Sequence, residues 1–408
     1  MAGKKLLFIH GNLSGGAGIA MQSLANSLLQ HGHNIEIVSE DSFLNFVKYK
    51  GLTSFLLKAR KYIYSRIYSL VVTNYKYEFK DVGFYTIPRF WMRNLLLKLE
   101  PEVIFIGSCS RFLNVAVVRD YCLKYNKRVI FIELDDNVFT GGCHYVNDCL
   151  KYSSSCCSRC PAVNIFYQHV PRRNYKIKES FLPLNPLVGT FAPFDGDIKK
   201  NSFFKLLDMI EVQSISYINT TDFDRYRELK RHLRNTVKDE LNVAFVCSNF
   251  RDKRKGIDDL ILIANSVYST QKVRFHLFGD ADSVKDDFNG INEVILHGVL
   301  DKEVLIEWLC HCDVFLNLTK ADKGPASLVF SLQIGLPVIS YKVGMAKFFV
   351  SKNDGYLIDT IGNSGLIINL LRTVNFRSFE LVGRDIQSFY SEERLDSVLQ
   401  SLNEVLEE

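Results

Sequence analysis

The sequence predicts an α/β protein made of two Rossmann-like domains that face an inter-domain cleft. Short apolar runs typical of buried strands alternate with helical patterns, and this alternation occurs once in each half of the chain. The chain has 408 residues, whereas single hydrophobic cores stop growing beyond roughly 250 to 300 residues. In open parallel sheets, ligands bind beyond the carboxyl ends of the strands, so we expect the site where two such sheets face each other.

The predicted strands are five to seven residues long and fall into two sets. They cover residues 5–10, 34–39, 103–107 and 128–133 in the first half, and 242–247, 273–279, 293–297, 314–318 and 337–341 in the second. A strand over 215–219 and a charged helix over 224–240 separate the sets, and a closing loop with a short strand follows over 351–359. We therefore expect one domain over 1–238, a second domain over 239–390, and a terminal helix over 391–408 that packs back across the lobes.

The composition is that of an ordinary globular enzyme. The net charge is only +5 and charged residues make up 23% of the chain, which does not suit a nucleic-acid-binding coat. No apolar run approaches the roughly 20 residues that span a bilayer, and the run after Lys5 is too short for a signal peptide. We expect a cytoplasmic protein without a nucleic-acid partner, whose contact with a membrane, if any, is peripheral on the inner face.

A glycine-rich loop directly follows the first strand. Gly15, Gly16 and Ala17 precede a helix, and such a loop lets backbone amides approach a diphosphate at the helix N-terminus. A tight strand-to-helix turn is the alternative. The nicotinamide fingerprint fits imperfectly because Met21 occupies its third glycine position, although Glu40 lies near the place of a ribose-binding acid.

A second candidate loop follows the strand that ends near residue 248. Residues 249–256 carry four cations just before a helix, and cations at the end of a strand suit a ligand rich in phosphate. A solvated basic turn is the alternative. Further on, Asp322 opens a loop that leads into an apolar helix, which Gly335 ends before the next buried strand.

Two other features concern metal and membrane. The thiolates of four cysteines have a spacing that would allow a structural zinc site, with free thiols as the alternative: Cys143, Cys149, Cys157 and Cys160.

From residue 48 to residue 98, lysines and arginines are interleaved with aromatic and aliphatic residues, while acidic residues are scarce. Such a stretch binds an anionic membrane surface or forms a solvated helix face.

Together, these motifs resemble the family-4 retaining glycosyltransferases of the GT-B fold, particularly those that build bacterial exopolysaccharide, capsule or O-antigen. The resemblance covers nearly the whole chain. Its landmarks are the loop at 15–17, the Thr-Gly-Gly-Cys-His-Tyr segment at 140–145 with its trailing cysteines, the Arg-Lys-Gly turn at 254–256, and the Gly-Leu-Pro-Val segment at 335–338 with Gly344 and residues 354–357.

The resemblance implies that the second domain binds a nucleoside-diphosphate sugar while the first holds a glycan acceptor. Lys255 matches the lysine that faces the diphosphate, and Asp322 matches the first acid of a pair near the transferred sugar. Asn249 stands where relatives often have an arginine, so Arg251 or Arg254 is expected to substitute. Ser327 is also expected to contact the donor. Catalysis would require no metal or other cofactor.

Two positions depart from the family pattern. The second acid of the pair, which normally bonds the ribose, is Phe330, and the histidine of the family's His-Asp pair is Leu134, followed by Asp135. Glu133, Asp136 or His144 are the candidates to take that histidine's role.

The function implied is retaining transfer of a sugar from a nucleoside diphosphate to a glycan acceptor, lipid-linked and used in surface polysaccharide synthesis. The alternative is a catalytically degenerate GT-B protein that binds a glycan or a partner. An epimerase of the same fold would need acid and base residues for which the sequence shows no candidates.

Overall fold

The computed structural model describes residues 3–13, 15–47, 50–190, 207–212, 223–234, 240–267, 272–288, 293–324, 326–344, 346–379 and 392–407. Internal contacts divide the chain into two compact units. Unit 1 comprises Met1–Tyr217 and Leu395–Glu408, and unit 2 comprises Ile218–Arg394. The predicted domain boundary at 238 and the predicted strand at 215–219 lie outside the described residues, so both stay predictions.

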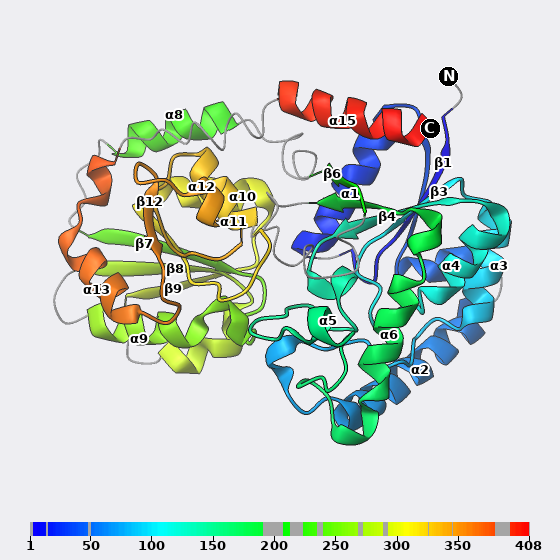
Figure 1. Cartoon of the computed structure of the whole chain (residues 1–408). Helices are drawn as coiled ribbons and strands as arrows, with labels where there is room; N and C mark the ends of the chain where they lie inside the picture. The colour runs from blue at the N-terminus through cyan, green and yellow to red at the C-terminus, as the bar shows by residue number, and fades with distance from the viewer. Residues whose placement is uncertain are drawn as a thin grey trace. The chain divides into compact units, whose positions relative to one another are not determined.

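Unit 1 is built on a sheet of six parallel strands in the order β2-β1-β3-β4-β5-β6 (Figure 1). The strands are β1 (Lys5–Ile9), β2 (Asn34–Val38), β3 (Val103–Ile106), β4 (Arg128–Glu133), β5 (Leu187–Thr190) and β6 (Met209–Glu211). β3 is buried at every position, because helices cover a parallel sheet on both faces and favour continuous apolar runs. The stacked rings of Phe8 and Phe105, 4.3 Å apart, join β1 to β3 across the core.

The helices of unit 1 include the terminal helix of the chain. They are α1 (Gly16–Gln30), α2 (Lys50–Val71), α3 (Arg89–Leu99), α4 (Ala116–Tyr125), α5 (Lys151–Ser154), α6 (His169–Glu179) and α15 (Glu392–Glu407), with short 3₁₀ turns η1 (Ser42–Phe46), η2 (Tyr75–Tyr77), η3 (Asp136–Phe139), η4 (Ile165–Tyr167) and η5 (Leu182–Leu184). The side chain of Arg128 donates to the carbonyl of Val405, and His33 contacts Asn403 at 3.1 Å. These contacts attach α15 to unit 1.

Unit 2 repeats the same plan with the strand order β12-β11-β10-β7-β8-β9, again parallel throughout. Its strands are β7 (Leu241–Cys247), β8 (Val273–Gly279), β9 (Val294–Gly298), β10 (Val314–Asn317), β11 (Val338–Tyr341) and β12 (Gly355–Ile358). Its helices are α8 (Phe223–Arg234), α9 (Ile257–Val267), α10 (Lys302–His311), α11 (Ala326–Gln333), α12 (Ala346–Phe349) and α13 (Ser364–Thr373), with η8 (Lys253–Lys255), η9 (Ala281–Phe288) and η10 (Phe376–Ser378). The prediction of an α/β protein with two parallel sheets is confirmed.

The strand order also locates the crevice in each sheet. In unit 1 the order reverses between β1 and β3, and in unit 2 it reverses between β7 and β10. At such a reversal the connections leave on opposite faces of the sheet, which opens a crevice beyond the carboxyl ends of the two strands. The loops that follow β1, β3, β7 and β10 are therefore where ligand-binding residues belong. Among the described helices, none is both long and apolar enough to span a bilayer.

Candidate functional site

The basic turn of unit 2 is fixed to the end of β10 by a glycine. Gly256 ends η8 with a φ of 80°, a conformation that residues with a Cβ adopt at a cost. A Cβ at Gly256 would lie 2.2 Å from the carbonyl oxygen of Leu318. In addition, the amide of Lys320 donates to the carbonyl of Arg254 at 2.7 Å. The close approach brings the cations that follow β7 onto the loop that follows β10.

This docking joins three of the predicted site residues. Lys255 Nζ donates to Asp322 Oδ2, and Arg254 Nη1 lies 3.9 Å from the same oxygen. Arg254 is held in place by Asp252 Oδ2 at 2.6 Å and by the carbonyl of Ala321 at 2.7 Å. Burial opposes ionisation of Asp322, but the charges of Lys255 and Arg254 outweigh it and hold the pKa of this carboxyl below its usual range. A cationic site with an ionised acid therefore lies at the switch point of unit 2.

The loop after β11 closes on the same place. A Cβ at Gly344, whose φ is 55°, would lie 2.2 Å from the carbonyl oxygen of Asp322. Ser327 stands in the first turn of α11 and is half-buried. Arg251 is exposed, and its backbone amide donates to the Asn249 side chain at 3.0 Å. Of the two arginines expected to replace the family's arginine, Arg254 is the one that lies beside Lys255 and Asp322.

Phe330 lies within the apolar packing of unit 2. It is 8% exposed, and its ring lies 6.2 Å from that of Phe223 at the start of α8. Its neighbours along α11, Leu328 and Val329, are buried as well. The position at which the resemblance implies a ribose-binding acid therefore contributes to the core here.

The glycine-rich loop of unit 1 begins α1. Gly15 caps the helix with a φ of 86°, and a Cβ at Gly15 or Gly16 would meet nothing within 4 Å. Ala17 is exposed in the same turn. Glu40 does not resemble a ribose ligand, because it pairs with Arg111 and lies 3.6 Å from Lys61 Nζ. Binding of an anion by this loop therefore stays a prediction.

Asp135 and His144 form a buried pair at the end of β4. His144 Nδ1 lies 2.6 Å from Asp135 Oδ2, and both residues are 8% exposed. Burial disfavours ionisation of Asp135, yet the pairing with His144 and a hydrogen bond from the amide of Asn137 lower its pKa from 3.8 to about 2. The Nδ1 proton is thus directed at the carboxylate, which leaves Nε2 as the reactive nitrogen. His144 Nε2 is buried and makes no hydrogen bond to any residue that the structure describes.

His10 lies close to this pair. It follows β1, and its Nδ1 accepts a hydrogen bond from the amide of Ser108, after β3, at 3.1 Å. Burial lowers the pKa of His10 to about 4, an effect that Asp135 opposes and His144 reinforces. A neutral imidazole therefore stands at the switch point of unit 1 beside the Asp135–His144 pair.

Lys178 supports the same segment and was not predicted from the sequence. Its ammonium is buried and donates to the backbone carbonyl of Asn137 and to the side-chain oxygen of the same residue, the latter at 3.1 Å. It also donates to the backbone carbonyl of Thr140 at 2.8 Å. Burial lowers the pKa of Lys178, although the charge of Asp81 opposes this. A lysine of α6 that spans the turn from 137 to 140 holds the backbone on which Asp135 and His144 stand.

The four cysteines of the predicted zinc site lie in one region. Cys143 and Cys160 are buried in a common apolar cluster, with Cys149 packed against it, and Cys157 Sγ accepts a hydrogen bond from the amide of Gly141 at 3.1 Å. Among the described residues, no group of three or more His, Cys, Asp or Glu side chains has an arrangement that could hold a metal ion. The arrangement of the side chains does not favour zinc, which stays a prediction.

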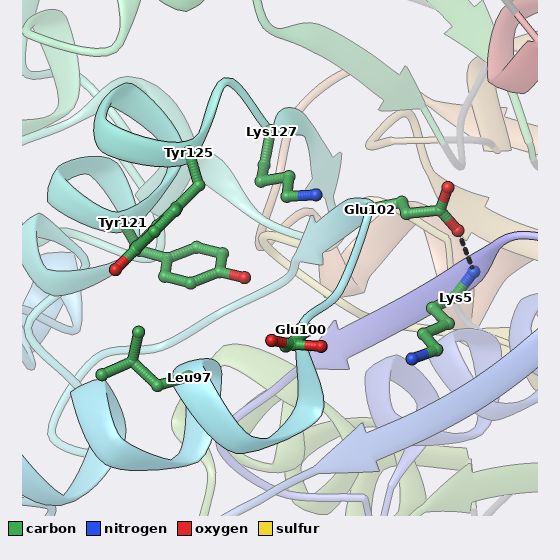
Figure 2. A pocket seen from close by; sticks show the side chains of 7 residues that line it. All are labelled: Lys5, Leu97, Glu100, Glu102, Tyr121, Tyr125 and Lys127. Carbon is green, nitrogen blue, oxygen red and sulfur yellow. Dashed lines mark hydrogen bonds between the residues drawn. The ribbon is translucent and has the colours of Figure 1, made fainter.

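The cavity drawn in Figure 2 lies at the amino ends of the strands of unit 1. It measures about 370 Å³ and is lined by Lys5, Leu97, Glu100, Glu102, Tyr121, Tyr125 and Lys127. Lys5 begins β1, while Glu102 and Lys127 come just before β3 and β4. Because these are the amino ends of the strands, the cavity is remote from the loops that carry the predicted site residues.

Residues 241–374 match the family model described as Glycosyl transferases group 1. This segment runs from β7 to α13 and contains Lys255, Asp322 and Phe330. No protein of curated function matches the sequence.

Solved structures match the whole chain. The sucrose-phosphate synthase of Thermosynechococcus elongatus aligns with 99% of each chain covered, at a TM-score of 0.65 and 13% identity. Anabaena HepE in complex with UDP aligns over 99% of each chain, at a TM-score of 0.57 and 14% identity. The chain therefore contains a glycosyltransferase domain and has the GT-B fold. WaaG, a glycosyltransferase involved in lipopolysaccharide biosynthesis, also aligns, with a TM-score of 0.59, 12% identity and coverage of 98% of this chain and 99% of that one. The predicted GT-B fold is confirmed.

Proposed function

We propose that this glycosyltransferase is a retaining enzyme of the family-4 type that moves a sugar from a nucleoside diphosphate to a lipid-linked glycan in surface polysaccharide synthesis. The observation that carries the proposal is the cluster of Arg254, Lys255 and Asp322 at the switch point of unit 2. Support for a nucleoside-diphosphate donor comes from Anabaena HepE, whose structures hold UDP or UDP-glucose. Support for the pathway comes from WaaG, which is involved in lipopolysaccharide biosynthesis.

The cluster suits the chemistry of the leaving group. When the bond between the sugar and the diphosphate breaks, negative charge develops on the oxygen that leaves with the phosphate. Charge-assisted hydrogen bonds from Lys255 and Arg254 would stabilise that charge more than the charge of the bound donor, which lowers the barrier. Asp322 holds the ammonium of Lys255 in place. It is also expected to accept a hydrogen bond from a hydroxyl of the transferred sugar.

In unit 1, His144 takes the role that the resemblance gives to a histidine at position 134. Its Nδ1 is oriented by Asp135, so its buried Nε2 is available to a hydroxyl of the sugar or of the acceptor. The second nitrogen of an imidazole oriented in this way can form such a hydrogen bond. Leu134, at the position of the family histidine, has no polar atom that could do this.

A product analysis tests the proposal. The protein is incubated with a panel of nucleoside-diphosphate sugars, and release of the free nucleotide and the anomeric form of the released or transferred sugar are followed by NMR. The proposal predicts slow hydrolysis of one donor with retention of the anomeric configuration. Inversion would contradict the retaining mechanism, and the absence of binding and hydrolysis with every donor would contradict the donor assignment.

The second candidate function is a catalytically degenerate GT-B protein that binds a glycan or a partner. The burial of Phe330 against Phe223 favours it, because no carboxylate stands at that position to hold a ribose. The two candidates differ in donor binding, which calorimetry with nucleotides and nucleotide sugars measures directly.

A further inference from the structure

Helix α2 exposes a row of apolar side chains to solvent. The row consists of six residues that are 38% to 68% exposed: Leu52, Phe55, Leu56, Tyr62, Ile63 and Leu70. Residues three, four and seven positions apart share one side of an α-helix, so these side chains form a continuous stripe. The opposite side of α2 carries buried residues, including Leu57 and Tyr64, which attach the helix to unit 1. Figure 1 shows α2, in blue, along the outside of this unit.

A second exposed apolar group lies close to the C-terminal end of α2. Ile165 and Phe166 in η4 are 77% and 82% exposed, and Phe166 is the most exposed large apolar side chain in the part of the chain that the structure describes. The segment is tied to the helix, since the amide of Asn164 donates to the carbonyl of Val71 at 2.8 Å. Soluble surfaces rarely gather so many large apolar side chains without a partner.

The charged residues of α2 itself are all cations. Residues 50–77 contain six lysines and arginines and no aspartate or glutamate. Arg60 turns inward and donates to the carbonyl of Thr86 at 2.9 Å, and Lys61 lies 3.6 Å from Glu40. Lys58 and Arg66 remain exposed on α2, and Arg66 donates to the hydroxyl of Tyr62 at 2.9 Å within the apolar row.

We infer that α2 and η4 together bind the surface of an anionic lipid bilayer. An apolar helix face flanked by cations enters the headgroup region, where the apolar side chains leave water and the cations meet anionic lipids. Because the other face of α2 is already packed on unit 1, binding requires no additional folding of the helix. Peripheral attachment also fits the finding that no described helix could span a bilayer.

The inference rests on the proposed function only for the reason why the enzyme would bind a membrane. A lipid-linked acceptor lies in the same bilayer, so attachment through unit 1 would bring the enzyme to its acceptor. The binding itself depends on neither donor nor turnover.

Co-sedimentation of the full-length chain with vesicles tests the inference. The protein is expected to sediment with vesicles of phosphatidylglycerol and phosphatidylcholine but not with phosphatidylcholine alone. It should detach as salt rises from about 0.1 to 1 M, since the Debye length falls from about 10 to 3 Å over that range.

Paired variants separate the two contributions. Lys58→Ser with Arg66→Ser should weaken partitioning about 25-fold, because each cation near an anionic surface contributes about 1 kcal/mol, or about fivefold. Phe55→Ser with Phe166→Ser should weaken it at least tenfold, because burying one such side chain contributes about 1.5 to 3 kcal/mol. Leu262→Ser with Lys285→Ser alters exposed residues of unit 2 and should bind like the unaltered protein. All variants should keep the original unfolding temperature.

Three results would overturn the inference. The first is equal binding to neutral and anionic vesicles, or none to either. The second is equal weakening by the control variant of unit 2. The third is a protein that does not bind vesicles but self-associates in solution, with the association lost in Phe55→Ser with Phe166→Ser, since the stripe would then join two copies of the chain. Donor hydrolysis is measured without lipid, so failure of the membrane surface and failure of the proposed chemistry are distinguishable.

Discussion

Replacing Asp135 by asparagine removes the charge that orients His144. The folded-state pKa of Asp135 is about 2, compared with an ordinary value of 3.8. At 1.36 kcal/mol for each pH unit, this difference corresponds to about 2 kcal/mol of stability. Because the pKa is lower in the folded protein, the contribution is complete at pH values above 3.8 and is lost as the pH falls toward 2.

Urea unfolding followed by fluorescence, at pH 7 and at pH 3, measures this contribution. Asp135→Asn should lower the free energy of unfolding by about 2 kcal/mol at pH 7 and by about half as much at pH 3, where part of the unfolded-state carboxyl is protonated. Asp148→Asn is the matched control, since Asp148 is an exposed carboxylate that pairs with Lys76 at 2.9 Å. Exposed pairs contribute at most about 1 kcal/mol. An equal loss at both pH values, or an equal loss in the control, would refute the stabilising role of the buried Asp135 carboxylate.

Further predictions concern other parts of the molecule. Phe330→Glu should tighten binding of the nucleotide sugar about tenfold, because one hydrogen bond to the ribose would be regained. If the variant loses stability while calorimetry shows an unchanged affinity, the catalytically degenerate protein is favoured. Gly256→Ala should destabilise unit 2 by at least about 2 kcal/mol, because the new Cβ would meet the backbone of Leu318. The control Gly298→Ala, whose Cβ would meet no described atom within 4 Å, should lower the free energy of unfolding by about 1 kcal/mol. Equal losses of stability in urea unfolding would contradict the close approach. If the four cysteines hold zinc, metal analysis of protein purified without chelator should find close to one zinc per chain, and a chelator should lower the unfolding temperature; a metal-free protein would end that prediction.

The strands that the sequence predicted most directly are those buried on both faces. β4 occupies residues 128–133 as predicted, because its four central residues form one apolar run and five of its six residues are buried. β5 and β6 were not predicted: they have only four and three residues, and Gly189 interrupts β5. Strands this short do not have an apolar pattern that distinguishes them from loops.

The candidate site likewise has a part that the sequence predicted and a part that it did not. Lys255 and Asp322 were predicted from the family resemblance, and they lie together because loops that follow adjacent strands at a switch point meet there. The pairing of His144 with Asp135 could not be predicted from the sequence. The segment of His144 is held by a backbone hydrogen bond from its amide to the carbonyl of Glu78 at 3.3 Å, a contact between distant segments that no local pattern specifies. Lys178 was missed for the same reason, since nothing in α6 distinguishes a buried lysine from a solvated one.

In the proposed function, Lys255 stabilises the charge of the departing diphosphate. Donor turnover by Lys255→Ala tests this role, with Lys253→Ala as the control in the same turn, since Lys253 is exposed. Lys255→Ala should fold normally and turn over its donor about 100-fold more slowly, the effect of losing one electrostatic stabiliser, while Lys253→Ala should stay close to the unaltered rate. Unchanged turnover in a folded Lys255→Ala protein, or an equal loss in both variants, would contradict the role of Lys255.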